Sequence, residues 1–409
     1  MKSENNISKI IINKISNLNY NKKIYNKNVN KVRDFLNNVE KQYNYDKDIF
    51  HLFSKKLKIN FKKETIKKFN KFNTIILIGM GGSTLGAEAI YNSLNFKIKK
   101  NFIFMNNLDT YKVEKIKKDG KHKNALFLIV SKSGNTIETM ANLSLLKQKN
   151  YSSKNTIIIT ENKSSELFNF AKLNKIQIIE HKNYIGGRFS VLSEVGLLPA
   201  YLMKLSIKEI RKNVNNFFKP KYKKLLCNNV SQIAQCYSSK DIKSLILINY
   251  YPPLNSFMYW AQQLIAESLG KNKKGLIPIV SIAPKDHHSL LQLYLDGPKD
   301  KIYYIISSKG YSNLKMYSND VSKKLKYLKN KKIETIVEAQ KNALISSFKK
   351  KKIPYREIVT KPITESLIGE LFSTFIVETI LIAKILKINP LDQPAVEQVK
   401  ILTKKYLSK

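Results

Sequence analysis

Short apolar runs, most of them rich in β-branched residues, alternate with helical stretches along most of this chain, and that alternation limits the fold more than any other feature. In the first half the runs span 74–78, 102–105, 125–130, 156–160 and 176–179; in the second half they span 245–248, 277–282, 302–306 and 358–360. Strands that alternate with helices of ten or more residues form right-handed βαβ units, whose parallel sheet is covered by helices on both faces. The sequence therefore predicts an α/β protein with two αβα sandwich domains and mainly parallel sheets.

The same pattern divides the chain into a helical N-terminal region, two α/β domains and a C-terminal helix. The four regions span 1–70, 71–205, 206–388 and 389–409. The first is rich in Lys and Asn with a weak helical period of apolar residues, so peripheral helices are expected there. A helical connector at about 205–240 leads into the second domain, and Asn389-Pro390 separates the last two helices.

The composition bears on the partners of the protein. Of 73 basic residues only four are Arg, and the lysines are spread along the whole chain, giving a formal net charge of +43. Nucleic-acid-binding proteins gather charge on one face and use Arg for bidentate contacts, whereas AT-rich coding favours Lys, Asn and Ile together. We expect solvated lysines that attract anionic metabolites, and no specific nucleic-acid partner beyond weak binding at low salt.

Hydropathy and cysteine content indicate a cytoplasmic protein with no membrane partner. The first twenty residues contain an apolar run of only three residues, whereas a secretory leader needs about 7–15. The most apolar long stretch, 371–386, carries Glu378 and Lys384 in its middle, which favours a buried helix over a membrane span. Cys227 and Cys236 are too few for a disulfide framework and have no nearby His, so we expect a reducing compartment and no bound metal.

A glycine-rich turn follows the first predicted strand. Residues 75–88 read IILIGMGGSTLGAE, which is an apolar strand, then glycines and hydroxyls, then a helix. In a parallel sheet such a turn lies at the carboxyl edge, where its amides and the helix N-terminus favour an anion. A Rossmann fingerprint would need Gly at Thr84, and a P-loop would need Gly-Lys-Ser/Thr. The turn either holds an anion with Gly82 and Ser83, or is a tight strand–helix turn in which Ser83 caps the helix.

A second turn, SKSGNT at 131–136, has three hydroxyls where a helix cap needs one. This combination with an internal Lys suits a phosphomonoester of charge about −1.5 to −2. The candidate phosphate-binding residues are Ser131, Lys132, Ser133 and Thr136. Asn135 and Glu138 have the spacing of a capping box, which by itself is structural. Two such turns on one sheet favour a phosphate ligand over a purely structural role.

The two turns resemble those of sugar isomerase (SIS) domains, the phosphosugar-binding fold. Four further blocks, in family order, are similar to the glucose-6-phosphate isomerase family. They are GGRFS at 186–190, QLIAESLGK at 263–271, HSLLQL at 288–293 and DQPAVEQVK at 392–400. The resemblance implies two SIS-type domains and a phosphosugar substrate. It also implies reversible isomerisation of glucose 6-phosphate to fructose 6-phosphate in glycolysis and gluconeogenesis, without a cofactor, by a homodimer.

Aldose–ketose isomerisation through an enediol(ate) needs a base beside C1 and C2, a cation near the developing oxyanion, and an acid/base pair that opens the ring. On the helix predicted at 256–270, Glu267 lies beside the apolar face marked by Trp260, and Gln263 projects one turn earlier. Their match to the family block implies that Glu267 is the base and that Gln263 contacts the substrate. The helix alone favours another interpretation, a surface ion pair between Glu267 and Lys271.

The resemblance implies three more catalytic residues. Arg188 matches the family arginine beside the enediolate, where a planar and permanently charged fork is useful; the alternative is an ordinary ion pair. His288 matches the ring-opening histidine, which in the family reaches the active site of the neighbouring subunit. Its neighbour His287 stands where the family usually has Gln. Lys400 matches the residue near the ring oxygen, on a helix whose apolar residues predict a docked face.

Three other functions fit parts of the sequence. Another phosphosugar isomerase of the same fold, including one that also accepts mannose 6-phosphate, would use the same turns and base. A non-catalytic phosphosugar-binding SIS module would use the turns alone. A basic nucleic-acid-binding protein ranks last because the charge is scattered. Turnover of individual phosphosugars distinguishes the first two from each other.

Overall fold

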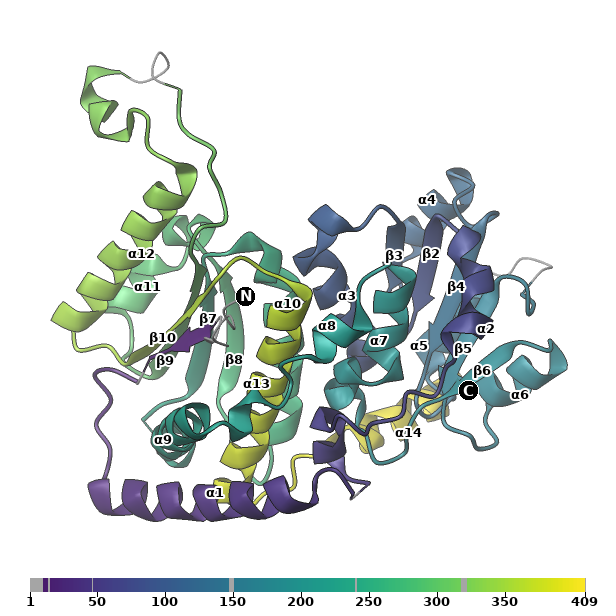
Figure 1. Ribbon diagram of the computed structural model, residues 1–409, viewed down its shortest axis with the longest axis horizontal. Helices are drawn as coiled ribbons and strands as arrows, with labels where there is room; N and C mark the ends of the chain where they lie inside the picture. Colours follow the sequence, from purple (N-terminus) through teal and green to yellow (C-terminus); the bar gives the residue numbers. More distant parts are fainter. Residues whose placement is uncertain are drawn as a thin grey trace, which may run out of the picture.

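The computed structural model of the chain contains two five-stranded sheets, each flanked by helices (Figure 1). It describes residues 10–13, 15–45, 47–146, 151–239, 241–317 and 322–408. The two sheets come from the two halves of the chain in which the alternating pattern occurs. The predicted α/β class with two mainly parallel sheets is therefore confirmed.

The first sheet is wholly parallel and has the strand order β3-β2-β4-β5-β6. Its strands are β2 (Thr74–Ile78), β3 (Asn101–Met105), β4 (Ala125–Val130), β5 (Thr156–Thr160) and β6 (Gln177–Glu180). Its crossover helices are α3 (Leu85–Ser93), α4 (Thr110–Lys118), α5 (Ile137–Leu145) and α6 (Glu166–Leu173). All six residues of β4 are buried, as expected for a central strand covered on both faces.

The second sheet has the order β1-β10-β9-β7-β8 and is parallel except at β1. Its strands are β1 (Ile10–Ile12), β7 (Ser244–Asn249), β8 (Ile277–Ile282), β9 (Lys301–Ser308) and β10 (Tyr355–Thr360). The prediction of helices throughout residues 1–70 is wrong for β1, which pairs antiparallel with β10. Three consecutive β-branched residues favour an extended strand, and the open edge of β10 provides the partner.

Helices fill the space around and between the sheets. Outside the first sheet's crossovers they are α1 (Lys22–Gln42), α2 (Lys63–Lys67), α7 (Glu194–Leu202), α8 (Ile207–Arg211), α9 (Pro220–Ser238), α10 (Asn255–Leu269), α11 (Leu291–Asp296), α12 (Ile333–Lys350), α13 (Glu365–Leu386) and α14 (Ala395–Leu407). Helix α10 packs against both α3 of the first half and α13 of the second. Helix α1, although N-terminal, packs along α9 and α13. Segments distant in sequence thus meet around α10.

Helix α13 is the central helix of the second half. It begins where the Thr364 hydroxyl accepts a hydrogen bond from the Leu367 amide, and ends at Lys387 in the left-handed conformation. By length and composition it is the one helix of the described residues that is apolar enough to cross a membrane, and 94% of its most apolar window is buried in the fold. The buried helix expected around 371–386 is therefore present.

Helix α14 differs from the expectation of a docked face, because none of its residues is buried. Its exposed apolar side chains are Val396, Val399, Ile401, Leu402, Tyr406 and Leu407. The amphipathic period correctly predicted a helix, but no element among the described residues covers its apolar side.

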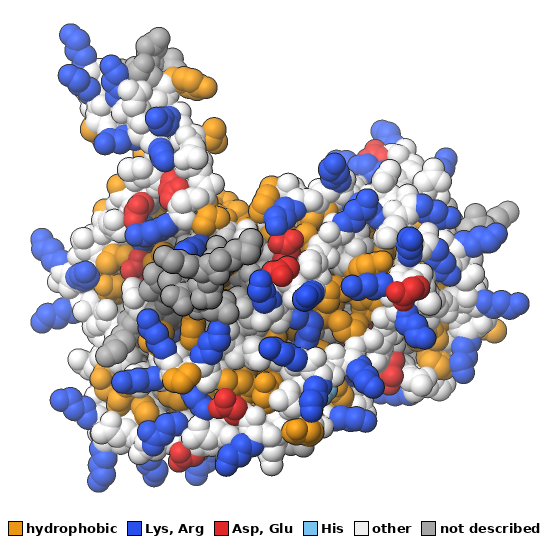
Figure 2. All heavy atoms as spheres, viewed as in Figure 1, with side chains coloured by type: hydrophobic (Ala, Val, Ile, Leu, Met, Phe, Trp, Pro, Cys, Tyr) orange, Lys and Arg blue, Asp and Glu red, His pale blue; other side chains and the backbone are white. Residues whose placement is uncertain are grey.

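The lysines are dispersed over the surface. On the face shown in Figure 2, Lys and Arg side chains lie among polar and apolar groups and do not form one continuous patch. This distribution agrees with the expectation of solvated lysines.

Candidate active site

Two turns meet at the carboxyl edge of the first sheet. Strands β2 and β4 are parallel neighbours, so the turn after Ile78 and the turn after Val130 emerge side by side. They are so close that a Cβ on Gly79 would lie 2.7 Å from the Val130 carbonyl oxygen. The two phosphate-binding candidates predicted from separate motifs therefore share one edge of one sheet.

Position 82 must be glycine because the backbone of Gly187 and Arg188 passes very close to it. A Cβ at this position would lie 2.3 Å from the Gly187 carbonyl carbon and 2.5 Å from the Arg188 nitrogen. The glycine-rich turn and the GGR segment therefore touch through their backbones. The Ser83 hydroxyl does not cap α3, because the N-cap residue is Thr84 and its hydroxyl donates to the Gly81 carbonyl. The structural alternative for Ser83 is therefore wrong.

The hydroxyls of the second turn form a small network. Ser131 Oγ lies 3.0 Å from Thr136 Oγ1 and accepts a hydrogen bond from the Gly134 amide at 3.2 Å. Ser133 is exposed, and its Oγ accepts from the Asn135 amide. The capping box suggested by Asn135 is absent, since its side chain accepts from the Glu166 amide in the next crossover. Two hydroxyls and the N-terminus of α5 thus lie together at this edge.

The Lys132 ammonium points to the neighbouring strand ends. Its Nζ donates to the Asn183 carbonyl at 2.8 Å and lies 3.6 Å from the Glu161 carboxylate. Burial lowers the pKa of Lys132, and Glu161 opposes that shift. Lys132 therefore contributes positive potential beside the turn, while its ammonium is held away from the Ser131–Thr136 hydroxyls.

Helix α10 presents the carboxylate and the amide that the sequence singled out. Gln263 Nε2 donates to Glu267 Oε1 at 2.8 Å, one helical turn away. The Gln263 amide also reaches the glycine-rich turn, because a Cβ on Gly81 would lie 2.6 Å from its Nε2. The Glu267 side chain is 33% exposed, so a small molecule can reach it. The polar side of α10, formed by Gln263 and Glu267, therefore faces the glycine-rich turn at the carboxyl edge of the first sheet.

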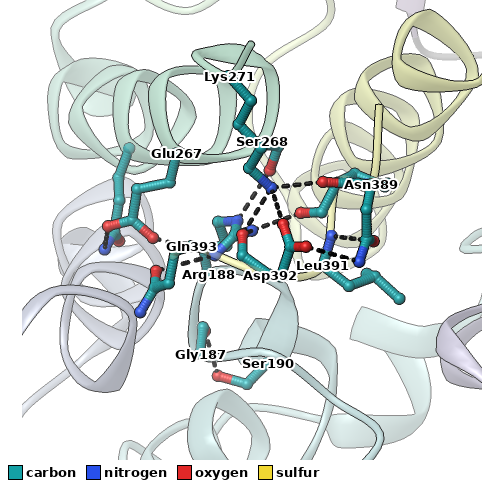
Figure 3. A network of polar contacts seen from close by, with 12 residues as sticks. Gly187, Arg188, Ser190, Glu267, Ser268, Lys271, Asn389, Leu391, Asp392 and Gln393 are labelled. Atoms are coloured by element: carbon teal, nitrogen blue, oxygen red, sulfur yellow. Dashed lines mark hydrogen bonds and ion pairs between the residues drawn. The ribbon is translucent and has the colours of Figure 1, made fainter. Parts of the chain in front are cut away.

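Arg188 lies at the centre of the polar network drawn in Figure 3, and its side chain is only 3% exposed. Nη1 donates to Glu267 Oε2 and to Gln393 Oε1, each at 3.1 Å. Nε donates to Ser268 Oγ at 2.8 Å. Nη2 donates to the carbonyls of Pro390 and Asp392. Burial lowers the pKa of Arg188 and Glu267 opposes that shift, so the fork stays charged.

Lys271 has a different partner from the one that the helix period suggested. Its Nζ contacts Asp392 Oδ1 at 2.8 Å, the Asp392 carbonyl at 2.6 Å and the Asn389 carbonyl. Glu267 pairs instead with Arg188, so the surface Glu267–Lys271 pair is not formed. Lys271 and Arg188 together hold the connection between α13 and α14 against α10 (Figure 3).

His288 lies on another part of the molecule, in the turn after β8. Its side chain is exposed. The neighbouring His287 is half-buried, and its Nε2 lies 2.6 Å from Tyr250 Oη. The structure brings Gly82, Gln263, Glu267 and Arg188 into direct contact, whereas His288 takes no part in that network.

Lys400 is also outside the network. Its Nζ contacts Glu397 Oε1 at 2.6 Å on α14, and its side chain is 60% exposed. The connection before α14 is fixed by Arg188 and Lys271, but Lys400 itself follows it by two helical turns.

Sequence reasoning did not single out three residues that the structure places in the network, namely Ser268, Lys271 as a partner of Asp392, and Gln393. Gln393 lies in the DQPAVEQVK block and Ser268 in the QLIAESLGK block, so their membership in these blocks was the signal. Periodicity could not indicate them, because Gln393 is 205 residues from Arg188 and precedes its helix.

Among the described residues, no three His, Cys, Asp or Glu side chains lie close enough to hold a metal ion.

The arrangement has the chemical parts of an isomerase. A reachable carboxylate lies against a buried guanidinium, and the backbone of the glycine-rich turn touches the backbone of that arginine. A carboxylate can move a proton, and a fixed cation can stabilise the oxyanion that forms. The fold and site define an α/β protein with two sheets and with the groups needed for acid–base chemistry on a small molecule.

Comparison with known proteins identifies the family. The family model of phosphoglucose isomerase matches residues 24–409. The glucose-6-phosphate isomerase of Methanocaldococcus jannaschii is 33% identical over 347 residues, covering 82% of this chain and 84% of that protein. This chain belongs to the phosphoglucose isomerase family, whose members are aldose–ketose isomerases acting on glucose 6-phosphate and fructose 6-phosphate.

Two solved structures show the same fold. A hypothetical protein from Thermus thermophilus superposes with a TM-score of 0.82 at 21% identity, covering 94% of this chain and 96% of that one. A glucose-6-phosphate isomerase from Chlamydia trachomatis superposes with a TM-score of 0.72 at 20% identity, covering 85% and 72%. Both halves of the chain are therefore built as in these proteins.

Proposed function

We propose that this chain interconverts glucose 6-phosphate and fructose 6-phosphate by moving one proton between C1 and C2, with Glu267 as the base. The observation that carries the proposal is the contact of Glu267 with Arg188 at 3.1 Å, beside the turn that Gly82 allows to approach Arg188. In this arrangement a carboxylate that a small molecule can reach is in contact with a permanent cation.

The proton balance of the reaction assigns a role to each group. The Glu267 carboxylate takes the C2 proton of the open-chain aldose, and negative charge moves to O1, where Arg188 stabilises it. A proton passes from O2 to O1, and Glu267 returns its proton to C1 as the C2 carbonyl forms. Gln263 Oε1 is buried without a hydrogen-bond partner among the described residues, so it is available to accept from a sugar hydroxyl.

The phosphate binds in this proposal at the two turns of the first sheet. Ser83, Ser131, Ser133 and Thr136 supply hydroxyls, Gly82 and its neighbours supply amides, and Lys132 supplies positive potential. The support is the shared carboxyl edge of β2 and β4 and the N-terminus of α5 beside it. The phosphate then holds the sugar so that C1 and C2 reach Glu267.

Ring opening requires a second subunit in this proposal. His288 is exposed and takes no part in the Glu267 network, so His288 of one copy would serve the site of another. Two unpartnered features support a homodimer. Helix α14 exposes its apolar side, and the segment between β9 and α12 extends away from the body (Figure 1) with Leu314 and Tyr317 exposed. Lys400 on α14 would then reach the ring oxygen once the helix is covered.

Two experiments test these steps. In D2O, proton transfer through a base and an enediolate incorporates solvent deuterium at C2 of recovered glucose 6-phosphate, whereas complete retention of hydrogen would contradict a Glu267 intermediate.

For the shared site, Glu267→Gln and His288→Ala subunits are mixed and refolded together. If the site is shared between copies, hybrids regain activity because one of their two sites is intact; no recovery means that each site is built from one chain.

We also propose that this protein is a cytoplasmic enzyme of glycolysis and gluconeogenesis. Substrate specificity is tested by measuring turnover of mannose 6-phosphate, the C2 epimer, beside that of glucose 6-phosphate.

A further inference from the structure

The turn that carries His288 is anchored at one side by a carboxylate. It follows β8 and contains Lys285, Asp286, His287 and His288. Asp286 Oδ2 accepts hydrogen bonds from the Ile282 amide at 2.7 Å and from Ser281 Oγ at 3.1 Å. These bonds tie the first half of the turn to the end of its own strand.

The other anchor comes from the neighbouring strand. Tyr250, the residue after β7, is 1% exposed, and its amide donates to the Ile306 carbonyl at 2.8 Å. Its hydroxyl lies 2.6 Å from His287 Nε2, and the two rings meet edge to face with centroids 5.6 Å apart. A buried tyrosine held by the sheet thus fixes the imidazole that immediately precedes His288.

The protonation states suit this contact. Burial lowers the pKa of His287, so the neutral imidazole is favoured and Nε2 accepts a hydrogen bond when Nδ1 carries the ring proton. Burial raises the pKa of Tyr250, so the phenol keeps the proton that it donates. Two neighbours on the same turn also act on the pKa of His287: His288 lowers it and Asp286 raises it.

We propose that Tyr250 and His287 are positioning residues that hold this turn so that the next side chain, His288, is presented outward to a bound sugar. The inference rests on the proposed function, in which His288 opens the ring. With Asp286 and His287 both tied to strand ends, His288 is the one imidazole of the turn left exposed. A displacement of about 1 Å at such a group costs on the order of 100-fold in rate.

Ring opening can be measured apart from isomerisation. The C1–O5 bond breaks as the O1 hydroxyl loses its proton and O5 gains one, and closing on the other face of C1 gives the other anomer. Exchange between the α and β anomers of glucose 6-phosphate therefore reports ring opening alone. Measured by magnetisation transfer in a Glu267→Gln background, it excludes the C1–C2 proton transfer.

The test compares Tyr250→Phe, His287→Ala and His287→Gln in that background, with Tyr237→Phe, a buried tyrosine of α9, as control. We expect the first two to slow anomer exchange at least about 10-fold. His287→Gln restores most of it, because its carboxamide oxygen accepts from the phenol. Affinity for the acyclic hexitol 6-phosphate, which has no ring to open, stays within about twofold of the parent for all four variants.

Each outcome decides between the alternatives. His288→Ala is measured in the same background as the reference for loss of ring opening. If it slows exchange but Tyr250→Phe and His287→Ala do not, the positioning role is overturned and the proposed function stands. If His288→Ala itself leaves exchange unchanged, the ring-opening role of His288 fails. If Tyr250→Phe weakens binding of the acyclic probe as much as it slows exchange, and His287→Gln gives no rescue, the pair is merely structural and the inference is wrong.

Discussion

Nη1 of Arg188 lies 3.1 Å from Oε2 of Glu267, and this contact joins a turn of the first half of the chain to a helix of the second. The guanidinium is almost completely buried, which is costly unless its donors are satisfied. All three of its nitrogens donate, to Glu267, Ser268, Gln393 and two backbone carbonyls. The proposed base is therefore oriented by the cation that we propose stabilises the enediolate.

Replacing Arg188 with Lys should abolish most of the activity although the charge is kept. A single ammonium cannot reproduce donors aimed at both α10 and the α13–α14 connection, so we expect kcat/KM to fall by at least about 100-fold. Steady-state kinetics with fructose 6-phosphate measures this. Arg33→Lys, at an exposed arginine bonded to Asn30, serves as control and should change nothing. Activity of Arg188→Lys within threefold of the wild type would contradict the role.

Lys271 is expected to act through the segment that it holds. Lys271→Met removes three contacts to residues 389–392, so that Arg188 alone still holds Gln393 and the connection to α14. We expect kcat to fall about 10-fold while KM changes less, since the phosphate turns are untouched. Lys97→Met breaks the Lys97–Glu365 ion pair and is the matched control. A rise in KM with unchanged kcat would place Lys271 in substrate binding instead.

The hydroxyl turn should govern affinity. Ser131→Ala removes the acceptor of the Gly134 amide and one proposed phosphate donor, so KM should rise about 10-fold with little change in kcat. Gly134 has φ +70°, a left-handed conformation that this hydrogen bond supports. Ser144→Ala, at an exposed position on the same α5, should leave KM unchanged. A loss confined to kcat would argue against phosphate binding at this turn.

Stability should fall in mild acid because of His181. Its side chain is 2% exposed, and burial lowers its pKa to about 4 from an ordinary 6.5. As the pH falls below about 6.5, the imidazole becomes protonated in the unfolded state but stays neutral in the folded state. The free energy of unfolding therefore falls by up to about 3 kcal/mol by pH 4. Above pH 6.5 both states are neutral and the effect vanishes.

Urea unfolding of the wild type and His181→Gln at about pH 7.5 and about pH 5 measures this term. Between the two pH values, we expect the wild type to lose about 2 kcal/mol more than the variant. Equal losses in the two proteins would show that His181 does not titrate differently on folding.

Most strands were predictable because each contains a short local run of apolar residues between helical stretches. The run at 125–130 coincides with β4, and the run at 277–282 with β8. Ile10–Ile12 was not predicted as a strand, because its partner β10 lies about 350 residues later and no local pattern indicates an antiparallel edge. The capping box predicted at Asn135 is absent for a similar reason: the Asn135 side chain accepts a hydrogen bond from the amide of Glu166, which is distant in sequence.

The candidate site was predictable in its residues but not in its connections. The motifs singled out Gly82, Gln263, Glu267 and Arg188, and the structure brings these together. The pairing of Lys271 with Asp392 could not be inferred, because helical spacing offered Glu267 as a nearer partner. Burial of Arg188 removes Glu267 from that choice, since an unpaired buried cation costs more than an exposed Lys–Glu pair contributes.

The most direct test of the central claim is the turnover of Glu267→Gln with fructose 6-phosphate, together with its affinity for the acyclic hexitol 6-phosphate. Gln preserves the size of the side chain but cannot accept the C2 or C1 proton, so we predict a loss in kcat of about 10²–10⁴-fold with affinity for the probe within about threefold of the wild type. Glu365→Gln, at a carboxylate paired with Lys97, should keep full activity. Turnover of Glu267→Gln near the wild-type value would show that another group moves the proton, and would contradict the account.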